Sequence, residues 1–380
     1  MKISNPLGVV VANIFLKGLL GLVILLVVVI AAGLGYRAWR QHQTAQITAI
    51  RTPNGIDEAR FIKVGGQDQW ITIRGQDRSN PVLLMLDGGP GAAGSPFVPS
   101  PWEKDFVVVE WDQPGAGKTF AKAGQKIDPS IGMDTMIQDA IEVAEYTRGH
   151  LHKTKIGLMA SSWGTFFGIP VVKKRPDLFY AYVGTGQDVN FQHGEALNYQ
   201  HVLAKAHARG DAKAIAELEK SGPPPYRSDA AFRLQRKWAE AYEIGPSNAS
   251  LISIMVYSPR YSLGDVSAWF GGFLASQDHF FGKTMNGPAV SHDAYALGPD
   301  FALPMFVFQG TQDDYTPFDE ARNYMAWIHA PQKEFVAAEG AGHYAAATHS
   351  GELRKLMLER VRPLGLAAEP PPPPAPPARP

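Results

Sequence analysis

The stretch from residue 155 to 168, Lys-Ile-Gly-Leu-Met-Ala-Ser-Ser-Trp-Gly-Thr-Phe-Phe-Gly, constrains the fold of this chain more than any other. It opens with a short apolar run, Ile156 to Met159, which has the length and composition of a buried strand. It then passes through Ala160-Ser-Ser-Trp-Gly164 into a predicted helix, with Ala160 where a glycine is more usual. A serine between small residues on a tight strand-to-helix turn has the form of a nucleophile elbow. If Ser162 is a nucleophile, the rest of the chain must supply a base, an acid and an oxyanion hole.

The composition argues against several other classes of function. The chain has 380 residues, a formal net charge of +0 and no cysteine. A neutral balance gives no electrostatic footprint for nucleic acid, and without cysteine there is no disulfide, thiolate zinc site or catalytic thiol. No His, Asp and Glu residues have the spacing of metal ligands, so neither a metal nor a cofactor is expected. Gly115-Ala-Gly-Lys-Thr119 resembles the end of a phosphate-binding loop, but Asp112 stands where the first glycine is required, which argues against nucleotide binding.

The N-terminal segment is predicted to be a membrane helix. From Gly18 to Tyr36 there is no charged residue, and at the helical rise this run spans roughly 28 Å, close to a bilayer core. Signal-peptide cores are usually shorter, roughly 7–15 residues, so residues 1–36 are interpreted as an uncleaved anchor; a cleaved signal peptide, cut near Ala31-Ala32-Gly33, is the alternative. Positive charges nearly balance across the run, so orientation is weakly determined; we expect a single-pass anchor with the following domain on the exported, periplasmic or extracellular, side.

After this segment, apolar runs of strand length alternate with stretches of helical periodicity. Strands are predicted within residues 61–74, 81–86, 106–110, 156–159, 181–185, 304–309 and 333–338. Helices are predicted at 133–150, 195–208, 212–220, 230–242, 250–257, 318–329 and 351–361. This alternation predicts an α/β fold in three layers, with a mostly parallel sheet flanked by helices.

The same pattern predicts the organisation of the chain into segments. Residues 37–58 are polar and mixed and are predicted to be a stalk. Residues 59–187 and 301–364 are predicted to form the α/β core, and the helical block 188–300 is predicted to be a lid inserted into it. Residues 365–380, almost all proline and alanine near the end, are predicted to form a disordered, Pro-rich tail.

Two loops downstream of Ser162 carry candidate partners for it, and each follows a predicted strand. In enzymes with such an elbow, the acid and then the histidine follow the serine in the chain. Asp313 lies at the carboxyl end of the strand 304–309, where catalytic side chains of parallel sheets collect, and Asp314 is the alternative acid. His343 lies in a glycine-rich loop after the next strand. We predict that His343 acts as general base and then general acid, and that Asp313 orients its imidazole.

An oxyanion hole requires two backbone N–H groups near Ser162. The first is predicted to come from Trp163, the residue after the nucleophile. The second is predicted to come from the turn Asp87-Gly-Gly-Pro-Gly91, because glycine allows a substrate oxygen to approach the backbone closely. Gly89 is the predicted donor in this turn, and Gly88 is the alternate.

Together these stretches resemble the proline iminopeptidase (prolyl aminopeptidase) branch of the α/β-hydrolase fold, over about residues 60–362. That branch has a His-Gly-Gly-Pro-Gly turn, an Asp-Gln-Arg-Gly turn, a Gly-Gly-Ser-Trp-Gly elbow, a Gly-x-x-Asp acid loop and a Gly-His or Ala-His base loop. The corresponding stretches here are Asp87-Gly-Gly-Pro-Gly91, Asp112-Gln-Pro-Gly115, Ala160-Ser-Ser-Trp-Gly164, Gly310-Thr-Gln-Asp313 and Gly342-His343. The resemblance implies a serine hydrolase that releases a small N-terminal residue from a peptide or amide through an acyl-enzyme. A carboxylesterase or other acyl hydrolase is the alternative, and a non-catalytic binding protein is a less favoured one.

The departures from the family pattern make the identity of the substrate less certain than the identity of the nucleophile. Asp87 replaces the family histidine beside the oxyanion turn, and a carboxylate there would oppose a forming oxyanion unless it were neutralised or turned away. Aminopeptidases of this branch hold the free amine of the substrate with lid carboxylates. Glu195 is the candidate for that role here, and further lid carboxylates are Glu217, Glu219, Glu240 and Glu243.

Overall fold

In the part of the chain that the computed structural model describes, residues 6–243, 245 and 248–369, eight strands form one sheet. They are β1 (Ile56–Val64), β2 (Gln67–Gly75), β3 (Val82–Leu86), β4 (Val107–Asp112), β5 (Ile156–Ser161), β6 (Phe179–Thr185), β7 (Met305–Gly310) and β8 (Lys333–Ala338). Their order across the sheet is β1-β2-β4-β3-β5-β6-β7-β8. The pairs β1–β2 and β2–β4 are antiparallel, and all pairs from β4 to β8 are parallel. The predicted α/β fold with a mostly parallel sheet is therefore confirmed.

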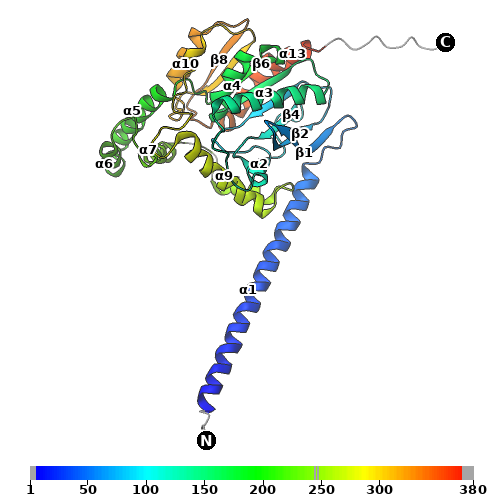
Figure 1. The fold of residues 1–380 in the computed structure, drawn as a ribbon, viewed down its shortest axis with the longest axis vertical. Helices are drawn as coiled ribbons and strands as arrows, with labels where there is room; N and C mark the ends of the chain where they lie inside the picture. The colour runs from blue at the N-terminus through cyan, green and yellow to red at the C-terminus, as the bar shows by residue number, and fades with distance from the viewer. Residues whose placement is uncertain (1–5, 244, 246–247, 370–380) are drawn as a thin grey trace, which may run out of the picture.

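Helices cover both faces of this sheet (Figure 1). Outside the insertion between β6 and β7, the described chain has α1 (Pro6–Ile47), which does not pack on the sheet, and then α2 (Gly117–Lys122), α3 (Met133–His150), α4 (Trp163–Lys174), α10 (Phe318–Trp327), α11 (Ala345–Thr348), α12 (Ser350–Leu356) and α13 (Arg362–Ala367). Shorter 3-10 turns span Pro176–Leu178 and Tyr295–Leu297, and a π-helical segment spans Met357–Val361. The helix predicted at 133–150 and the strand predicted at 333–338 begin and end at the predicted residues, whereas β1 begins earlier than the predicted strand, at Ile56.

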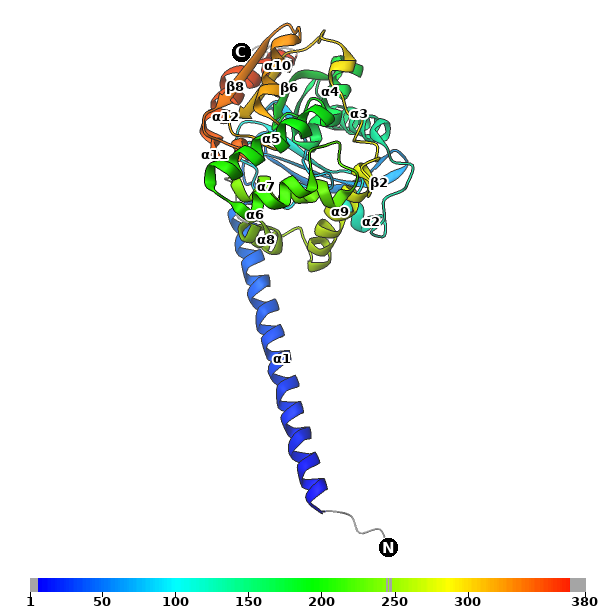
Figure 2. The same ribbon diagram turned by 90° about the vertical axis from the view of Figure 1, so that its left-hand side faces the viewer.

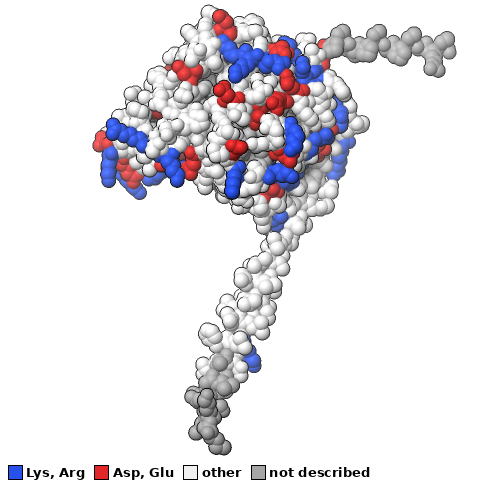
Figure 3. All heavy atoms as spheres, in the orientation of Figure 1, with Lys and Arg blue, Asp and Glu red and all other residues white. Residues whose placement is uncertain are grey.

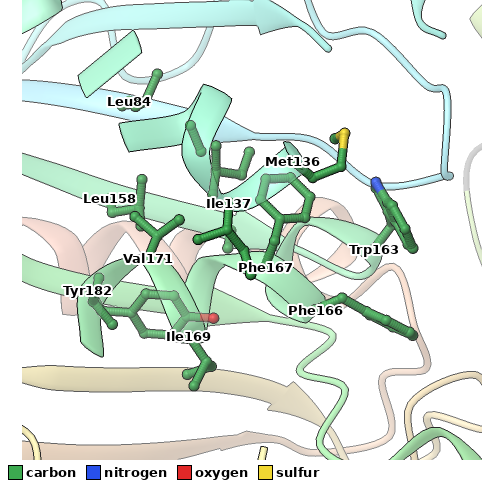
Figure 4. Packing of buried hydrophobic residues seen from close by; sticks show 14 of the residues in the cluster. Leu84, Met136, Ile137, Leu158, Trp163, Phe166, Phe167, Ile169, Val171 and Tyr182 are labelled. Carbon is green, nitrogen blue, oxygen red and sulfur yellow. The ribbon is translucent and has the colours of Figure 1, made fainter. Parts of the chain in front are cut away.

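Successive residues of the central strands point to opposite faces of the sheet, so each strand contributes to two cores. Leu84 and Leu158 belong to the larger cluster, which α3 and α4 cover, and Figure 4 shows them on the same side of the sheet as Ile137 of α3 and Val171 of α4. Their neighbours Leu83 and Met159 belong to a second cluster, which the C-terminal helices cover. Burial on both faces explains why these strands are continuous apolar runs in the sequence.

The insertion between β6 and β7 contains five helices in the described part of the chain. They are α5 (Phe191–Arg209), α6 (Ala212–Ser221), α7 (Asp229–Tyr242), α8 (Asn248–Tyr257) and α9 (Leu263–Phe281). We refer to this insertion as the lid. Helices α5, α6 and α7 pack on one another through their own apolar cluster, and α9 packs on α2. The sequence pattern predicts four of these helices and misses α9.

The missed helix α9 has clear local causes. The Ser262 hydroxyl caps its first turn by accepting a hydrogen bond from the backbone N–H of Asp265, at 3.0 Å. Gly272 lets the helix lie directly on the turn after β4, since a Cβ there would be 2.4 Å from the Gly115 carbonyl oxygen. Its adjacent glycines and its apolar outer face obscure the amphipathic pattern on which sequence-based prediction depends.

Helix α1 extends away from the rest of the molecule as one long element (Figures 1 and 2). Its segment Asn13–Ile47 is long and apolar enough to span a membrane, and its most apolar part makes no buried contact with the rest of the molecule. A signal sequence satisfies the same criteria. The region predicted to be a stalk, 37–58, consists of the last turns of α1, a short connection and the start of β1. At the other end of the chain, α13 includes residues of the predicted tail, and residues 370–380 of that tail lie outside the described residues.

Candidate active site

Ser162 lies on a strained turn between β5 and α4. Its backbone has φ 50° and ψ −117°, in the region of positive φ that residues other than glycine rarely adopt. The Ser162 N–H donates to the Thr185 carbonyl oxygen at 2.9 Å, which fixes the turn to the neighbouring strand. Gly164 is required because a Cβ there would lie 2.1 Å from the Leu86 carbonyl oxygen. This geometry is that of the predicted nucleophile elbow.

The unusual Ala160 of the elbow fits without distortion. Its side chain is fully buried, and a Cβ at Gly168, one turn into α4, would lie 3.1 Å from the Ala160 Cβ. The small residue that the elbow needs at position 160 is thus matched by a glycine on the facing helix. The methyl group of alanine fills the space between strand and helix.

A chain of hydrogen bonds joins Ser162, His343 and Asp313. His343 Nε2 lies 3.0 Å from Ser162 Oγ, and His343 Nδ1 lies 3.1 Å from Asp313 Oδ1 and 3.0 Å from Asp313 Oδ2. The imidazole stacks on the Tyr315 ring at a centroid distance of 4.9 Å, and its side chain is only 11% exposed. The structure therefore brings together the three residues that the sequence predicts as nucleophile, base and acid.

The Asp313 carboxylate is held in place by its own loop. Its Oδ1 accepts hydrogen bonds from the backbone N–H groups of Tyr315 and Thr316, both at 2.9 Å. Its Oδ2 accepts from the Thr316 hydroxyl at 2.8 Å and from the Gln309 amide at 2.9 Å. These donors stabilise the ionised carboxylate, which a partner of an imidazolium must be.

The alternative acid, Asp314, faces away from His343. Its carboxylate forms an ion pair with Lys205 of α5, and the His201 imidazole lies 3.6 Å from it. The two adjacent aspartates thus have separate tasks, because consecutive residues of a turn point in different directions. Asp313 contacts His343, and Asp314 joins the loop to the lid through Lys205.

The glycine turn after β3 lies against the elbow. A Cβ at Gly88 would be 3.4 Å from Ser162 Cβ, which places the backbone of the turn directly beside Ser162. Gly89, the predicted oxyanion donor, follows with φ +122°, and its carbonyl oxygen accepts a hydrogen bond at 3.0 Å from the Gln277 amide of α9. The lid therefore contributes to fixing this turn. Trp163, the other predicted donor, begins α4 directly after Ser162.

Gln113 joins the glycine turn to the elbow, and the sequence analysis did not predict this role. Its side-chain oxygen accepts from the Trp163 indole N–H at 3.1 Å, and its amide donates to the Asp87 carbonyl oxygen at 3.1 Å. The sequence did contain a signal for this role, because Gln113 lies in the Asp112-Gln-Pro-Gly115 turn at the carboxyl end of β4, and β4 is beside β3 in the sheet. With both bonds made, the buried Gln113 holds the two halves of the predicted oxyanion hole at a fixed separation.

The Asp87 side chain turns away from Ser162, which answers the electrostatic objection to an acid at this position. Its Oδ2 accepts a hydrogen bond at 2.7 Å from the Gly94 N–H, and it is hydrogen-bonded to the buried Glu110 carboxyl. Burial raises the pKa of Asp87 to about 6, and burial together with Asp87 raises that of Glu110 well above its usual value. Two adjacent buried carboxyls do not both ionise. The pair therefore holds a proton to higher pH than isolated carboxyls do.

Buried carboxyls gather where the lid leaves the core. Glu195, the predicted amine-binding residue, forms an ion pair with Arg236 of α7, and its Oε2 has no hydrogen-bond partner in the described structure. Asp188 is linked to the elbow by two hydrogen bonds. Its N–H donates at 3.0 Å to the Thr165 hydroxyl, and that hydroxyl donates to the Ser162 carbonyl oxygen. Burial and neighbouring carboxylates raise the pKa of Asp188 well above its usual value.

A further lid carboxyl, Glu243, lies against the His343 loop. A Cβ at Gly342 would overlap it, so glycine is required there. Burial raises the pKa of Glu243 to about 7, and the charge of Asp313 acts in the same direction, while His343 opposes the shift. Of the other lid carboxylates considered from the sequence, Glu217 is half-buried and accepts hydrogen bonds from Lys237 and Trp238 of α7, whereas Glu219 of α6 and Glu240 of α7 are exposed.

The remaining features of the sequence acquire structural contacts rather than ligand sites. In the stretch that resembles the end of a phosphate-binding loop, Lys118 forms an ion pair at 2.7 Å with Asp265 of α9. The Thr119 hydroxyl accepts a hydrogen bond from the Trp70 N–H at 2.8 Å. Across the residues that the structure describes, no group of three or more His, Asp or Glu side chains could hold a metal ion.

Comparisons with known proteins agree with this fold. Residues 81–350 match the model of a family described as alpha/beta hydrolase fold. A protein of Bacillus subtilis (strain 168) named probable aminopeptidase YbaC is 28% identical over 291 residues, which cover 74% of this chain and 89% of that protein. The crystal structure of proline iminopeptidase from Mycobacterium smegmatis superposes with a TM-score of 0.60 at 16% identity, covering 82% of this chain and all of the other (100%). A membrane phospholipase A superposes with a TM-score of 0.56 at 17% identity, over 91% of this chain and 99% of that one.

Proposed function

The chain belongs to the α/β-hydrolase fold family, and from this premise we propose that it is a serine hydrolase acting through an acyl-enzyme on Ser162. The observation that supports the proposal is the hydrogen-bonded path from Ser162 Oγ through the His343 imidazole to Asp313. His343 accepts the hydroxyl proton as Oγ attacks the substrate carbonyl, and Asp313 stabilises the imidazolium. The N–H groups of Gly89 and Trp163 hold the developing oxyanion. His343 then gives the proton to the leaving group, and a water molecule activated in the same way releases the acyl group.

We further propose that the substrate is a small peptide or amide with a free N-terminal amine. The aminopeptidase name of the Bacillus subtilis relative supports this choice. So does Asp188, a buried carboxyl whose Oδ1 has no hydrogen-bond partner among the described residues and lies 3.7 Å from His292 Nε2. Burial lowers the pKa of His292 to about 4, so its imidazole is neutral at neutral pH and does not oppose the raised pKa of Asp188. A bound substrate ammonium would stabilise the ionised form of Asp188, with Glu195 as a second carboxylate that Arg236 shares.

The nucleophile is tested by labelling with a fluorophosphonate followed by peptide mapping. Ser162→Ala should lose the label, whereas Ser161→Ala, a matched change at the preceding residue, should keep it. Labelling that persists in Ser162→Ala would refute the assignment. These two variants separate the attacking hydroxyl from its neighbour within the same turn.

The substrate class is tested with a proline arylamide, its N-acetylated form and a p-nitrophenyl ester. An aminopeptidase cleaves the free amine substrate and loses activity when the amine is blocked. Asp188→Asn should then raise KM for the arylamide and leave turnover of the ester unchanged, because an ester without an amine does not use that carboxyl. Turnover of the ester with both arylamides untouched would favour the acyl hydrolase alternative.

One observation supports the acyl hydrolase alternative: aromatic side chains lie between the elbow and the lid. The Trp163 and Phe280 rings lie 4.7 Å apart between centroids, and those of Phe191 and Phe281 lie 5.4 Å apart. These four side chains are buried in one aromatic cluster beside the elbow, and apolar surroundings of this kind suit an acyl chain. The non-catalytic alternative is weakened by the orientation of Asp87 away from Ser162.

We also propose that α1 is an uncleaved anchor and that the hydrolase domain lies on the exported side of the membrane. The proposal is supported by the length and hydropathy of the helix and by its continuation as a helix well beyond residue 36. Protease treatment of right-side-out and inside-out vesicles tests the orientation. Digestion of the hydrolase domain only from the cytoplasmic face would refute it.

A further inference from the structure

The outer surface of the lid differs between its two parts. Helices α6 and α7 carry charged residues on their exposed sides, as the sequence of α6, Ala-Lys-Ala-Ile-Ala-Glu-Leu-Glu-Lys-Ser, illustrates. Helix α8 has no charged residue, and α9 has only Asp265, Asp278 and His279. Five large apolar side chains on α8 and α9 are between 39% and 55% exposed: Ile252, Ile254, Leu263, Phe270 and Leu274. We call these five residues the apolar lid face.

Three of these residues form a stripe along α9. Leu263, Phe270 and Leu274 are separated by seven and four positions, which is the spacing of one side of a helix. The opposite side of α9 contacts the hydrolase core, where the buried Ser276 hydroxyl donates to the Gly115 carbonyl oxygen at 3.1 Å and the Trp269 indole donates to the Ala93 carbonyl oxygen at 3.0 Å. The three apolar side chains of the stripe are therefore not needed to pack α9 against the core. Exposed apolar patches of this kind mark surfaces that contact a partner or a membrane.

Helix α1 is joined to the same part of the lid at the point where its apolar run ends. Arg37, the first charged residue after that run, donates to the carbonyl oxygens of Val256 at 3.1 Å and Tyr261 at 2.6 Å. One turn later, the Gln41 amide donates to the carbonyl oxygens of Ser258 at 2.7 Å and Tyr261 at 3.0 Å. Both ribbon views place α8 and α9 on the face of the domain from which α1 extends (Figures 1 and 2). A bilayer crossed by α1 would thus end at the level of the lid.

Aromatic residues mark the same level. Tyr36 and Trp39 of α1 lie 5.7 Å apart between ring centroids, both are at least half exposed, and the Tyr257 ring lies 6.0 Å from Tyr36. Tyrosine and tryptophan are enriched at the boundary between hydrocarbon and water. The Arg40 guanidinium lies 4.8 Å above the Tyr257 ring, where it can also reach lipid phosphates. Figure 3 shows α1 beyond this level as an almost uncharged column.

From this geometry we propose that the apolar lid face rests in the interfacial layer of the lipid bilayer, as a second membrane contact beside α1. The inference goes beyond the proposed hydrolase activity and rests on α1 as a membrane anchor. The bilayer is the occupant that fits, because no linker separates the end of the apolar run from the lid. Apolar side chains of a helix lying along the interface insert into the boundary between headgroups and acyl chains, while its polar side faces the protein. The helix that holds the oxyanion turn would then lie directly on lipid.

The absence of native cysteine makes this contact measurable by single-site labelling of the full chain. Leu263→Cys, Phe270→Cys and Leu274→Cys would each carry a nitroxide in proteoliposomes of phosphatidylcholine and phosphatidylglycerol. Ala216→Cys, an exposed site on α6, is the water-facing control, and Leu25→Cys, in the middle of the apolar run, is the lipid-facing control. The thermal unfolding midpoint of each labelled variant verifies that the fold is retained.

Power saturation compares the access of oxygen, which concentrates in lipid, with that of a nickel chelate, which stays in water. The proposal expects the ratio of oxygen to nickel access at positions 263, 270 and 274 to exceed that at 216 several-fold and to approach that at 25. Ratios at the three lid positions equal to that at 216, with a lipid-like ratio at 25, would overturn the lid contact and leave the anchor intact. A water-like ratio at 25 would overturn both. Spin–spin broadening between singly labelled chains at the lid positions would assign the face to a second copy and also overturn the proposal.

Discussion

Replacing Gly186 by alanine is expected to slow acylation of Ser162 by about two orders of magnitude while leaving the fold intact. Gly186 follows β6 with φ +55°, and a Cβ there would lie 2.8 Å from His343 Cε1 and 3.2 Å from His343 Nδ1. Carbon atoms in contact prefer separations of about 3.5 Å or more, so the imidazole must move by about 0.7 Å. The 3.0 Å hydrogen bond between His343 Nε2 and Ser162 Oγ would then lengthen beyond the useful range.

Gly210→Ala is the matched control for this change. Gly210 ends α5 with φ +64°, but a Cβ there would meet no atom within 4 Å. Both substitutions force alanine into the left-handed region, at a cost of roughly 1–2 kcal/mol in the free energy of unfolding. Only Gly186→Ala also displaces the imidazole, so only that variant should lose reactivity.

The assay is the rate constant for fluorophosphonate labelling, which requires no knowledge of the natural substrate, together with the thermal unfolding midpoint. Both variants should show a similar decrease in Tm, while the labelling rate falls in Gly186→Ala alone. A labelling rate of Gly186→Ala close to that of the unmodified protein would refute the argument that the position of His343 depends on the lack of a side chain at Gly186. Equal losses in the two variants would mean that strain, and not contact, controls the rate.

Three further predictions concern the acid, the oxyanion hole and the pH dependence of stability. Asp313→Asn should lower kcat/KM by about 10⁴-fold, because an amide favours the wrong imidazole tautomer, whereas Asp314→Asn should leave kcat/KM near its original value; the reverse order would contradict the assignment. Gln113→Leu leaves the indole N–H of Trp163 without its acceptor; it should cost about 1–3 kcal/mol in stability and lower kcat more than it raises KM, and an unchanged kcat would exclude the bridging role. Burial raises the pKa of Asp139 to about 6, so the native state holds a proton that the unfolded state has lost between about pH 4 and 6, and stability falls as pH rises through that window. Asp139→Asn should therefore gain Tm relative to the unmodified protein from pH 4 to 7, and a constant difference would show that Asp139 does not titrate there.

The order and type of most core elements could be predicted from the sequence because they follow from local patterns. The run Val82–Leu86 is apolar at every position because both faces of β3 are buried, and 133–150 has the spacing of a helix with one buried side. The elbow was recognisable because a strained turn between strand and helix tolerates only small residues around Ser162. The loops that carry Asp313 and His343 were found because each follows a strand of the same sheet.

Contacts between distant parts of the chain were decided by the tertiary structure. Beyond the place of Asp313 in the Gly-x-x-Asp motif, nothing local distinguishes it from Asp314; packing directs the first toward His343 and gives the second Lys205. The Arg236 partner of Glu195 likewise comes from another lid helix, and it changes Glu195 from a free carboxylate into half of an ion pair.

The elbow itself illustrates the division between sequence and structure. The sequence alone determined that Ser162 lies on a turn that must end a buried strand, since the sizes of Ala160 and Gly164 are local properties. Only the tertiary structure decided what surrounds it: Gln113 bridging the turn, the Asp87 carboxyl turned toward Glu110, and α1 joined to the lid. Periodicity and residue size report the environment along one element, whereas hydrogen bonds between elements depend on how the whole chain packs.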